Sequence, residues 1–189
     1  MEAIIKKTKE GYIPAEVVLV ISDNPSAPAL ERARKYGVKA IYLYPGEKKT
    51  VLKGEAEEEY IRVLKEHKVD YVLLAGFMRI IKERFLKEFE GRILNIHPSL
   101  LPSFRGLHAQ RQAFEYGVKF SGCTVHFVTE DVDGGPIILQ ACVPVYDDDT
   151  PESLAERILK EEHRIYPEAV KLLVEGRLVL EGRRVKIKK

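Results

Sequence analysis

The sequence predicts an α/β fold with a mostly parallel sheet flanked by helices and an antiparallel C-terminal part. Through the first half of the chain, short apolar runs typical of buried strands alternate with segments whose apolar residues recur at helical spacing. Strands that alternate with helices favour a parallel sheet covered on both faces. After Gln112 two longer strand-like runs follow one another, which indicates an antiparallel pair. The chain has 189 residues, 45% of them hydrophobic, which is enough for one domain with a sizeable core.

The first half of the chain is predicted to alternate between helices and strands. Gly37 ends the second helix, and the strand 71–75 is a continuous apolar run, as expected of a strand buried on both faces. The predicted helices are 2–9, 27–36, 55–67 and 82–89, and the predicted strands are 15–21, 38–43, 71–75 and 92–96.

The second half is predicted to contain a short helix, two strands joined by a turn, and one long helix. These are a helix that ends at Tyr116, strands 123–128 and 136–146, the turn 131–135, and a helix from 151 to about 175. Pro151 marks the start of the long helix because proline is favoured at the first helical position, and Glu152 suits the positive end of the helix dipole. The basic tail 183–189 is predicted to be an alternating edge strand or a frayed end.

Composition excludes several classes of function. The formal net charge is +2, from 31 Lys and Arg against 29 Asp and Glu, so the chain has no overall field that would attract nucleic acid or an acidic membrane. No apolar run approaches the length of about 18 residues that a membrane span requires. Cys123 and Cys142 both lie in apolar runs, which predicts two small buried thiols in a reducing compartment. We therefore expect a cytoplasmic protein that acts on small molecules, without a nucleic-acid or membrane partner.

Asn95 and His97 stand at the end of the strand 92–96, directly before Pro98. Because they are two residues apart, both side chains point to the same face of an extended strand. Ligands of open α/β sheets bind outside the carboxyl ends of the strands, which is where this pair and the segment 75–80 fall. A histidine can act as a general acid or base near neutral pH, and an asparagine amide can donate to an oxyanion. The alternative is that His97 only caps the strand end and Asn95 only forms a turn.

Asp133 lies in an Asp-Gly-Gly turn between the two later strands. A tight hairpin turn would alone explain the glycines. A functional carboxylate at this position would orient His97 and stabilise its positive charge. An amide, an imidazole and a carboxylate together suit the attack of an amine on an acyl carbon. The chain shows no motif of a covalent nucleophile, and its histidines His97, His108, His126 and His163 show no recognised metal-ligand spacing.

Several ordered blocks of the chain carry a resemblance to one enzyme family. The blocks are Leu-Glu-Arg-Ala-Arg at 30–34, Leu-Ala-Gly-Phe-Met-Arg-Ile at 74–80, Leu-Asn-Ile-His-Pro-Ser-Leu-Leu-Pro at 94–102, Gly-Leu-His-Ala-Gln-Arg-Gln-Ala at 106–113, Val-His-Phe-Val-Thr at 125–129, Val-Asp-Gly-Gly-Pro-Ile-Ile-Leu-Gln at 132–140 and Glu-His-Arg-Ile-Tyr-Pro at 162–167. From Met1 to about Gly182 the chain resembles the phosphoribosylglycinamide formyltransferases, also called glycinamide ribonucleotide transformylases, which are folate-dependent enzymes of purine synthesis. The resemblance implies a Rossmann-like formyltransferase fold.

The resemblance also implies roles for individual residues. Asn95, His97 and Asp133 match the family's catalytic trio, which transfers a formyl group from the co-substrate 10-formyltetrahydrofolate to the amine of glycinamide ribonucleotide without a metal. The implied folate-binding residues are Met78, Arg79, Ile80, Ile81, Asn95, Val128, Thr129, Glu130, Asp131 and Val132, together with Lys53 in a loosely matching stretch. The implied substrate-binding residues are Gly76 and Pro98, which flank the glycinamide, and Glu162, which holds ribose hydroxyls. The structural alternatives are that Met78 and Ile80 belong to the core and that Glu162 belongs to a solvent-exposed helix face.

The chain departs from the family at its N-terminus. Family members begin with a strand and a Gly-Ser-Asn-type loop that binds the substrate phosphate at a helix N-terminus, whereas this chain starts at the helix that follows. We therefore expect residues 1–189 to form a single formyltransferase domain that is N-terminally truncated relative to the family, and we expect the natural polypeptide to extend upstream of Met1. A protein that began at Met1 would bind the ribonucleotide poorly.

Three alternative functions stay open at this point. Formyltetrahydrofolate hydrolase shares the Asn-x-His and Asp pattern but uses water as acceptor and usually carries a regulatory domain. Methionyl-tRNA formyltransferase carries a C-terminal RNA-binding extension, and we expect room for neither addition in 189 residues. A non-catalytic folate-binding module is the alternative of a different class if the truncation is real, and the presence of the trio argues against it.

Overall fold

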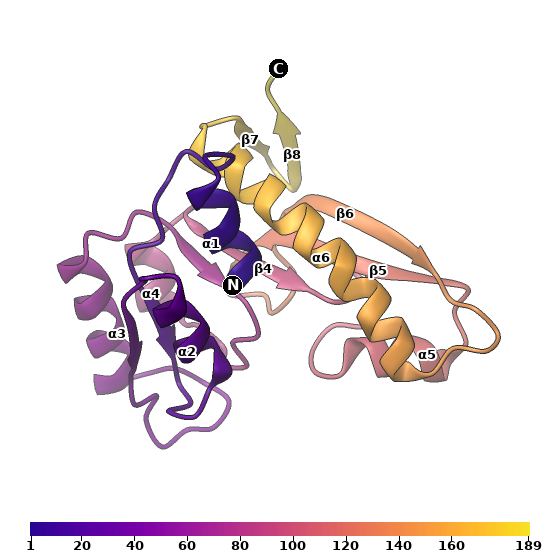
Figure 1. Cartoon of the computed structure of the whole chain (residues 1–189), viewed down its shortest axis with the longest axis horizontal. Coiled ribbons are helices and arrows are strands. Elements are labelled where there is room, and N and C mark those ends of the chain that lie inside the picture. Colours follow the sequence, from indigo (N-terminus) through magenta and orange to yellow (C-terminus); the bar gives the residue numbers. More distant parts are fainter. The chain divides into compact units, whose positions relative to one another are not determined.

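The computed structural model describes residues 1–189. The chain forms two compact units, Met1–Ile93 and Leu94–Lys189. Helices and strands alternate in the first unit, whereas the second combines a largely antiparallel sheet with two helices (Figure 1). The predicted α/β class with an antiparallel C-terminal part is confirmed.

The first unit contains short strands and amphipathic helices. Its elements are α1 (Glu2–Lys9), β1 (Val20–Ser22), α2 (Pro28–Lys35), β2 (Ala40–Tyr42), α3 (Glu55–Glu66), β3 (Val72–Leu74) and α4 (Glu83–Glu88). Strand β1 runs parallel to β2, with Ile21 opposite Ile41. A buried apolar cluster joins α1, α2, β1 and the segment before β2, and its members are Ile5, Ala33, Val20 and Val38.

The helix ends of the first unit follow from local sequence. Helix α2 begins with Pro28 and is followed by Gly37, whose φ of +72° is a conformation that glycine adopts without steric cost. Helix α3 has Glu55 in its first turn and Lys65 in its last, which places each charge at the favourable end of the helix dipole. These signals explain why the predicted helices agree closely with the observed ones.

The predicted strand 15–21 is wrong over most of its length. Only Val20–Ser22 is a strand, because β2 offers just Ala40–Tyr42 as hydrogen-bonding partners. An apolar run indicates burial, but a ladder also requires a neighbour of equal length.

The second unit holds the strands on which the predicted catalytic residues lie. Its elements are β4 (Ile93–His97, with Ile93 the last residue of the first unit), α5 (Ala109–Tyr116), β5 (Phe120–Phe127), β6 (Ile137–Pro144), α6 (Pro151–Val174), β7 (Leu178–Glu181) and β8 (Arg184–Ile187). The strand order within this unit is β4-β5-β6-β8-β7. Strands β4, β5 and β6 are antiparallel neighbours, and α6 lies along β5 and β6 (Figure 1).

The register between β4 and β5 decides which side chains share a face of the sheet. Asn95 lies opposite His126, and His97 lies opposite Thr124. Opposite residues of an antiparallel pair point to the same face, so these four side chains lie together. The predicted shared face of Asn95 and His97 is therefore confirmed.

Helix α6 is anchored at its start and again in its second half. At its start, the Thr150 hydroxyl accepts from the Ser153 amide and the Ser153 hydroxyl accepts from the Thr150 amide, which forms a capping box before the first turn. Further along, the buried Tyr166 hydroxyl donates to the Leu94 carbonyl at 3.2 Å. This bond fixes β4 to α6 one residue before Asn95.

Two further predictions about the second unit need correction. The basic tail does form a strand, Arg184–Ile187, but β7 occupies the edge of the sheet instead. The segment 178–181 pairs with β8 as a hairpin, which the sequence analysis did not predict. Cys123 is buried as predicted, whereas Cys142 is exposed, because alternate residues of β6 face opposite sides of the sheet.

None of the helices in the structure combines the length and apolar character that a membrane crossing needs.

Candidate active site

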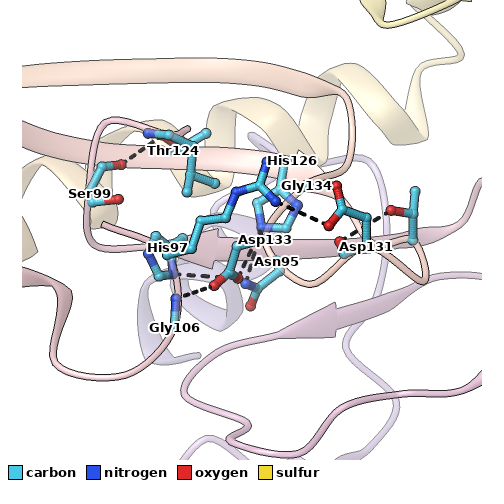
Figure 2. A network of polar contacts seen from close by, with 12 residues as sticks. Asn95, His97, Ser99, Gly106, Thr124, His126, Asp131, Asp133 and Gly134 are labelled. Carbon is cyan, nitrogen blue, oxygen red and sulfur yellow. Dashed lines mark hydrogen bonds and ion pairs between the residues drawn. The ribbon is translucent and has the colours of Figure 1, made fainter. Parts of the chain in front are cut away.

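One face of the β4 and β5 pair carries a cluster of polar side chains (Figure 2). The cluster contains Asn95 and His97 from β4 together with Thr124 and His126 from β5. The register between β5 and β6 shifts between Val125 and His126, which is an irregularity of the kind that re-aims side chains beside active sites. The opposite face is apolar, with Leu94 and Val125 fully buried.

His97 has acceptors at both ring nitrogens. Its Nε2 donates to the Phe104 carbonyl at 2.9 Å, because a carbonyl oxygen can only accept. Its Nδ1 lies 3.5 Å from Asp133 Oδ1. The bond from Nε2 fixes the tautomer of the neutral ring, so Nδ1 is the nitrogen that gains or loses a proton. At 3.5 Å the Nδ1 contact is longer than a normal hydrogen bond, which leaves this nitrogen available to a substrate atom.

Asp133 reaches His97 from the turn between β5 and β6. Its φ is +53°, a left-handed conformation that aspartate tolerates better than most residues. Its second oxygen, Oδ2, accepts from the Gly106 amide at 2.8 Å. The carboxylate is only 11% exposed, so it is held beside the imidazole rather than free in solvent. Asp133 therefore lies beside His97, as expected of a carboxylate that orients this imidazole.

His126 is a residue of this site that the sequence analysis did not assign. It is 2% exposed, and burial lowers its pKa, so the neutral ring is favoured. Its Nδ1 donates to the Phe127 carbonyl at 2.8 Å, which leaves the lone pair on Nε2. This lone pair accepts from Asn95 Nδ2 at 3.3 Å, and the same Nε2 lies 4.0 Å from Asp133 Oδ1. His126 thereby fixes which end of the Asn95 amide is the nitrogen.

The loop that follows β4 is held by a buried hydroxyl. Thr124 Oγ1 donates to the Ser99 carbonyl at 2.7 Å (Figure 2). The same oxygen accepts from the Leu101 amide at 3.1 Å. Gln140 of β6 donates to the same hydroxyl and to the Leu101 carbonyl, each at 3.0 Å. This network fixes the loop whose Phe104 carbonyl orients His97.

A signal for His126 and Thr124 does exist in the sequence. Both are polar, two residues apart, in the otherwise apolar run Cys-Thr-Val-His-Phe at 123–127. Polar residues at a spacing of two on a strand share one face. The pattern alone does not say which strand pairs with it, so the contact with Asn95 required the register.

The other predicted residues of the second unit lie around the same turn or on α6. Val128 is half-buried, while Thr129, Glu130, Asp131 and Val132 are exposed on the turn segment. Asp131 forms an ion pair with Arg105 at 3.1 Å. Pro98 follows His97 directly and is half-buried. Burial raises the pKa of Glu162 on α6 to about 7, so the alternative in which Glu162 is an ordinary solvent-exposed carboxylate is disfavoured.

The predicted residues of the first unit gather around one short bridge. Val51 pairs with Ile80, and the Leu52 amide donates to the Ile80 carbonyl at 3.0 Å, which brings Lys53 near the predicted segment 78–81. Met78 is 65% exposed and is not a core residue, whereas Ile81 is buried. Gly76 is exposed and has a φ of +72°.

Arg79 of the first unit is already engaged by protein groups. Its Nε donates to Asp23 at 2.7 Å, and its Nη1 donates to the Lys48 carbonyl. Its guanidinium therefore stabilises the segment, and a ligand would meet the backbone here rather than the charge.

The structure contains no group of three or more His, Cys, Asp or Glu side chains placed to hold a metal ion. The polar cluster on β4 and β5 instead offers an amide donor, an imidazole and a carboxylate. Such a set can stabilise an oxyanion and move protons between nitrogen atoms.

Comparison with known proteins agrees with this chemistry. The family model for formyl transferase matches residues 1–170. Phosphoribosylglycinamide formyltransferase of Escherichia coli (strain K12) is 42% identical over 94% of this chain and 83% of that protein. The trifunctional purine biosynthetic protein adenosine-3 of Drosophila melanogaster is 46% identical over 93% of this chain, which spans only 13% of that protein.

A solved structure extends the agreement to the fold. The crystal structure of glycinamide ribonucleotide transformylase 1 from Symbiobacterium toebii superposes with a TM-score of 0.95 at 55% identity, and the match covers 100% of this chain and 88% of that one. The resemblance stated from the sequence is thereby confirmed. The chain belongs to the formyl transferase family and, within it, to the phosphoribosylglycinamide formyltransferases.

Proposed function

We propose that the chain transfers the formyl group of 10-formyltetrahydrofolate to the amine of glycinamide ribonucleotide, a step of de novo purine synthesis. The meeting of an amide, an imidazole and a carboxylate, from Asn95, His97 and Asp133, carries the proposal. Membership of the phosphoribosylglycinamide formyltransferases supports this acceptor over water, which a formyltetrahydrofolate hydrolase would use.

The first step is attack of the amine nitrogen on the formyl carbon. A new C–N bond forms and the carbonyl electron pair moves to the oxygen, which becomes an oxyanion. One N–H of the Asn95 amide is bound to His126, so the second N–H is free to donate to the oxyanion. The second donor is the Nδ1–H of His97 in its imidazolium form, because the neutral ring keeps its one proton on Nε2 and the Asp133 carboxylate beside Nδ1 favours the second proton. Loss of one such donor typically raises a barrier by about 3 kcal/mol.

The second step moves one proton and breaks one bond. The attacking nitrogen gives up a proton to the Asp133 carboxylate, and His97 Nδ1 delivers a proton to the leaving nitrogen of the folate as its bond to carbon breaks. The 3.5 Å contact between Nδ1 and Asp133 Oδ1 then lets the proton return to His97. The products are the formylated amide and tetrahydrofolate.

The remaining residues are assigned to binding. In the first unit the folate set is Met78, Arg79, Ile80, Ile81 and Lys53, and in the second unit it is Asn95, Val128, Thr129, Glu130, Asp131 and Val132. The exposure of residues 129–132 on the turn segment supports a role in which the backbone of this segment reads a heterocycle edge. Gly76, Pro98 and Glu162 are assigned to the ribonucleotide, and the high pKa of the Glu162 carboxyl, raised by burial, suits a group that bonds hydroxyls rather than a cation.

The decisive experiment measures the fate of the formyl group with the purified protein. Folate and product are followed with and without glycinamide ribonucleotide. Formylation that requires the ribonucleotide, with little free formate in its absence, is the expected result. Equal formate release without the ribonucleotide would identify a hydrolase, and folate binding without either reaction would identify a binding module.

The proposed setting is the cytoplasm, with small-molecule substrates as partners. The near-neutral net charge of +2 gives no reason for a polyanionic partner. Cys123 and Cys142 are both free thiols, which suits a reducing compartment.

A further inference from the structure

The C-terminal hairpin of β7 and β8 lies beside the catalytic turn. Leu178 pairs with Ile187 and Glu181 with Arg184, and Gly182 with Arg183 form the connection. A single parallel pair, Ile137 with Arg184, joins the hairpin to β6. Ile137 begins β6 directly after the turn that carries Asp133, so the hairpin connection lies next to that turn.

One side chain of the hairpin reaches the turn itself. Arg183 Nη2 donates to the Gly134 carbonyl at 2.8 Å in a partly buried position. A guanidinium donor makes a stronger hydrogen bond than a neutral group does. Its acceptor belongs to the residue that immediately follows Asp133.

The turn contains two adjacent glycines, so a hydrogen bond from outside the turn helps to restrict its backbone. Gly134 and Gly135 have more backbone freedom than any other residue type. A side chain cannot replace the hydrogen of Gly135, because its Cβ would lie 1.8 Å from the Phe127 carbonyl oxygen, and a Cβ on Gly134 would lie 1.8 Å from the Asp131 carboxylate and displace it. The turn is therefore held by hydrogen bonds to its backbone and to its two carboxylates.

Only a few bonds hold the turn in place. The Gly134 amide donates to the Asp131 carbonyl at 2.9 Å, and Asp133 accepts from Gly106. Asp131 pairs with Arg105, but both of these side chains are largely exposed. The Arg183 bond is the one that reaches the glycine segment from another part of the second unit.

We infer that Arg183 is a positioning residue for the proposed reaction. By binding the Gly134 carbonyl it restricts the Gly-Gly segment and keeps the Asp133 carboxylate within reach of His97 Nδ1. The inference rests on the proposed function for its effect on rate, but its effect on the turn is independent of any activity.

The test compares three variants of the full chain. Arg183→Ala removes the donor, Arg183→Lys keeps a cationic donor, and Arg184→Ala is the matched control, because it removes the neighbouring exposed arginine that has no bond to the turn. In Arg183→Ala we expect kcat to fall about 5- to 20-fold with KM for the ribonucleotide nearly unchanged, as for loss of one charge-assisted hydrogen bond. Arg183→Lys should recover most of the rate, and Arg184→Ala should match the parent protein.

A second readout keeps the inference testable if the parent protein transfers no formyl group. Hydrogen exchange at the Gly134 amide, which is bonded within the turn, should quicken about tenfold in Arg183→Ala and not in Arg184→Ala. Equal exchange and equal kcat in the two alanine variants would overturn the inference. An inactive parent whose Arg183→Ala variant still shows faster exchange would overturn the proposed function alone.

Discussion

The Asn95 side-chain amide donates to the Nε2 lone pair of His126, a histidine that burial keeps neutral. The Phe127 carbonyl holds the proton of the other ring nitrogen, so Nε2 has no proton of its own to present. A carbonyl oxygen of Asn95 would find no donor at this point. The amide nitrogen is therefore held toward the histidine, and its second N–H is left for the reaction.

Substitution of His126 by phenylalanine should lower kcat about 10- to 100-fold, because the Asn95 amide loses the acceptor that sets its orientation. The double variant with Asn95→Ala is the informative control. If the two residues act as a unit, the double variant should be little worse than Asn95→Ala alone. Effects that multiply fully in the double variant would mean that His126 acts without Asn95.

His97→Ala should reduce turnover by about 100-fold or more, as expected for loss of a proton-transfer group. The circular dichroism spectrum should stay that of the parent protein. Since Nδ1 is the nitrogen that exchanges its proton, His97→Gln, which cannot shuttle one, should be similarly impaired. Near-normal turnover of either variant would remove His97 from the mechanism.

Asp133→Asn should also reduce turnover by about 100-fold or more while the Gly106 bond is retained, because an amide oxygen can still accept but cannot take up a proton. Asp148→Asn is the matched control, an exposed carboxylate in another loop of the same unit, and should leave kcat unchanged. Equal rates for the two variants would contradict the assignment of Asp133.

The buried His126 should make stability depend on pH. Burial lowers its pKa below the ordinary value of 6.5, so the unfolded chain binds the proton more readily than the folded chain. The stability contributed by the neutral ring is therefore present above pH 6.5 and is lost as the pH falls through the folded pKa.

Urea unfolding of the parent protein and of His126→Asn at about pH 8 and about pH 5 tests this sign. The parent's advantage in free energy of unfolding should be smaller at the acidic pH. Glu162, whose pKa burial raises to about 7, acts in the opposite direction but is present in both proteins and cancels. An advantage that grows on acidification would show that His126 is not held neutral.

The sequence predicted which residues belong to the site better than it predicted the contacts between those residues. The spacing of Asn95 and His97 gave their shared face because strand geometry is local, and the Asp-Gly-Gly turn pointed to Asp133 because turn chemistry is local. Helix ends followed from Pro28, Pro151 and Gly37 for the same reason. These parts of the fold depend on a few neighbouring residues.

What the sequence did not predict depends on pairing across the chain. His126 became a site residue only when the β4 and β5 register placed it opposite Asn95. The hairpin of β7 and β8 was missed because its first strand has just four residues, and the bond from Arg183 to Gly134 joins positions 49 residues apart. Local propensity carries no information about such contacts.

The alternation of side chains along strand β5 gives it two roles, one in the core and one in the polar cluster. Its odd-numbered residues Cys123 and Val125 are buried among apolar side chains, and its even-numbered residues Thr124 and His126 organise the polar cluster. A slip of one residue would exchange the two sets, which would destroy packing and chemistry in the same event. Substitutions intended to alter the polar cluster can therefore be confined to the even-numbered positions of this strand, because substitutions at its odd-numbered positions change the packing of the apolar face first.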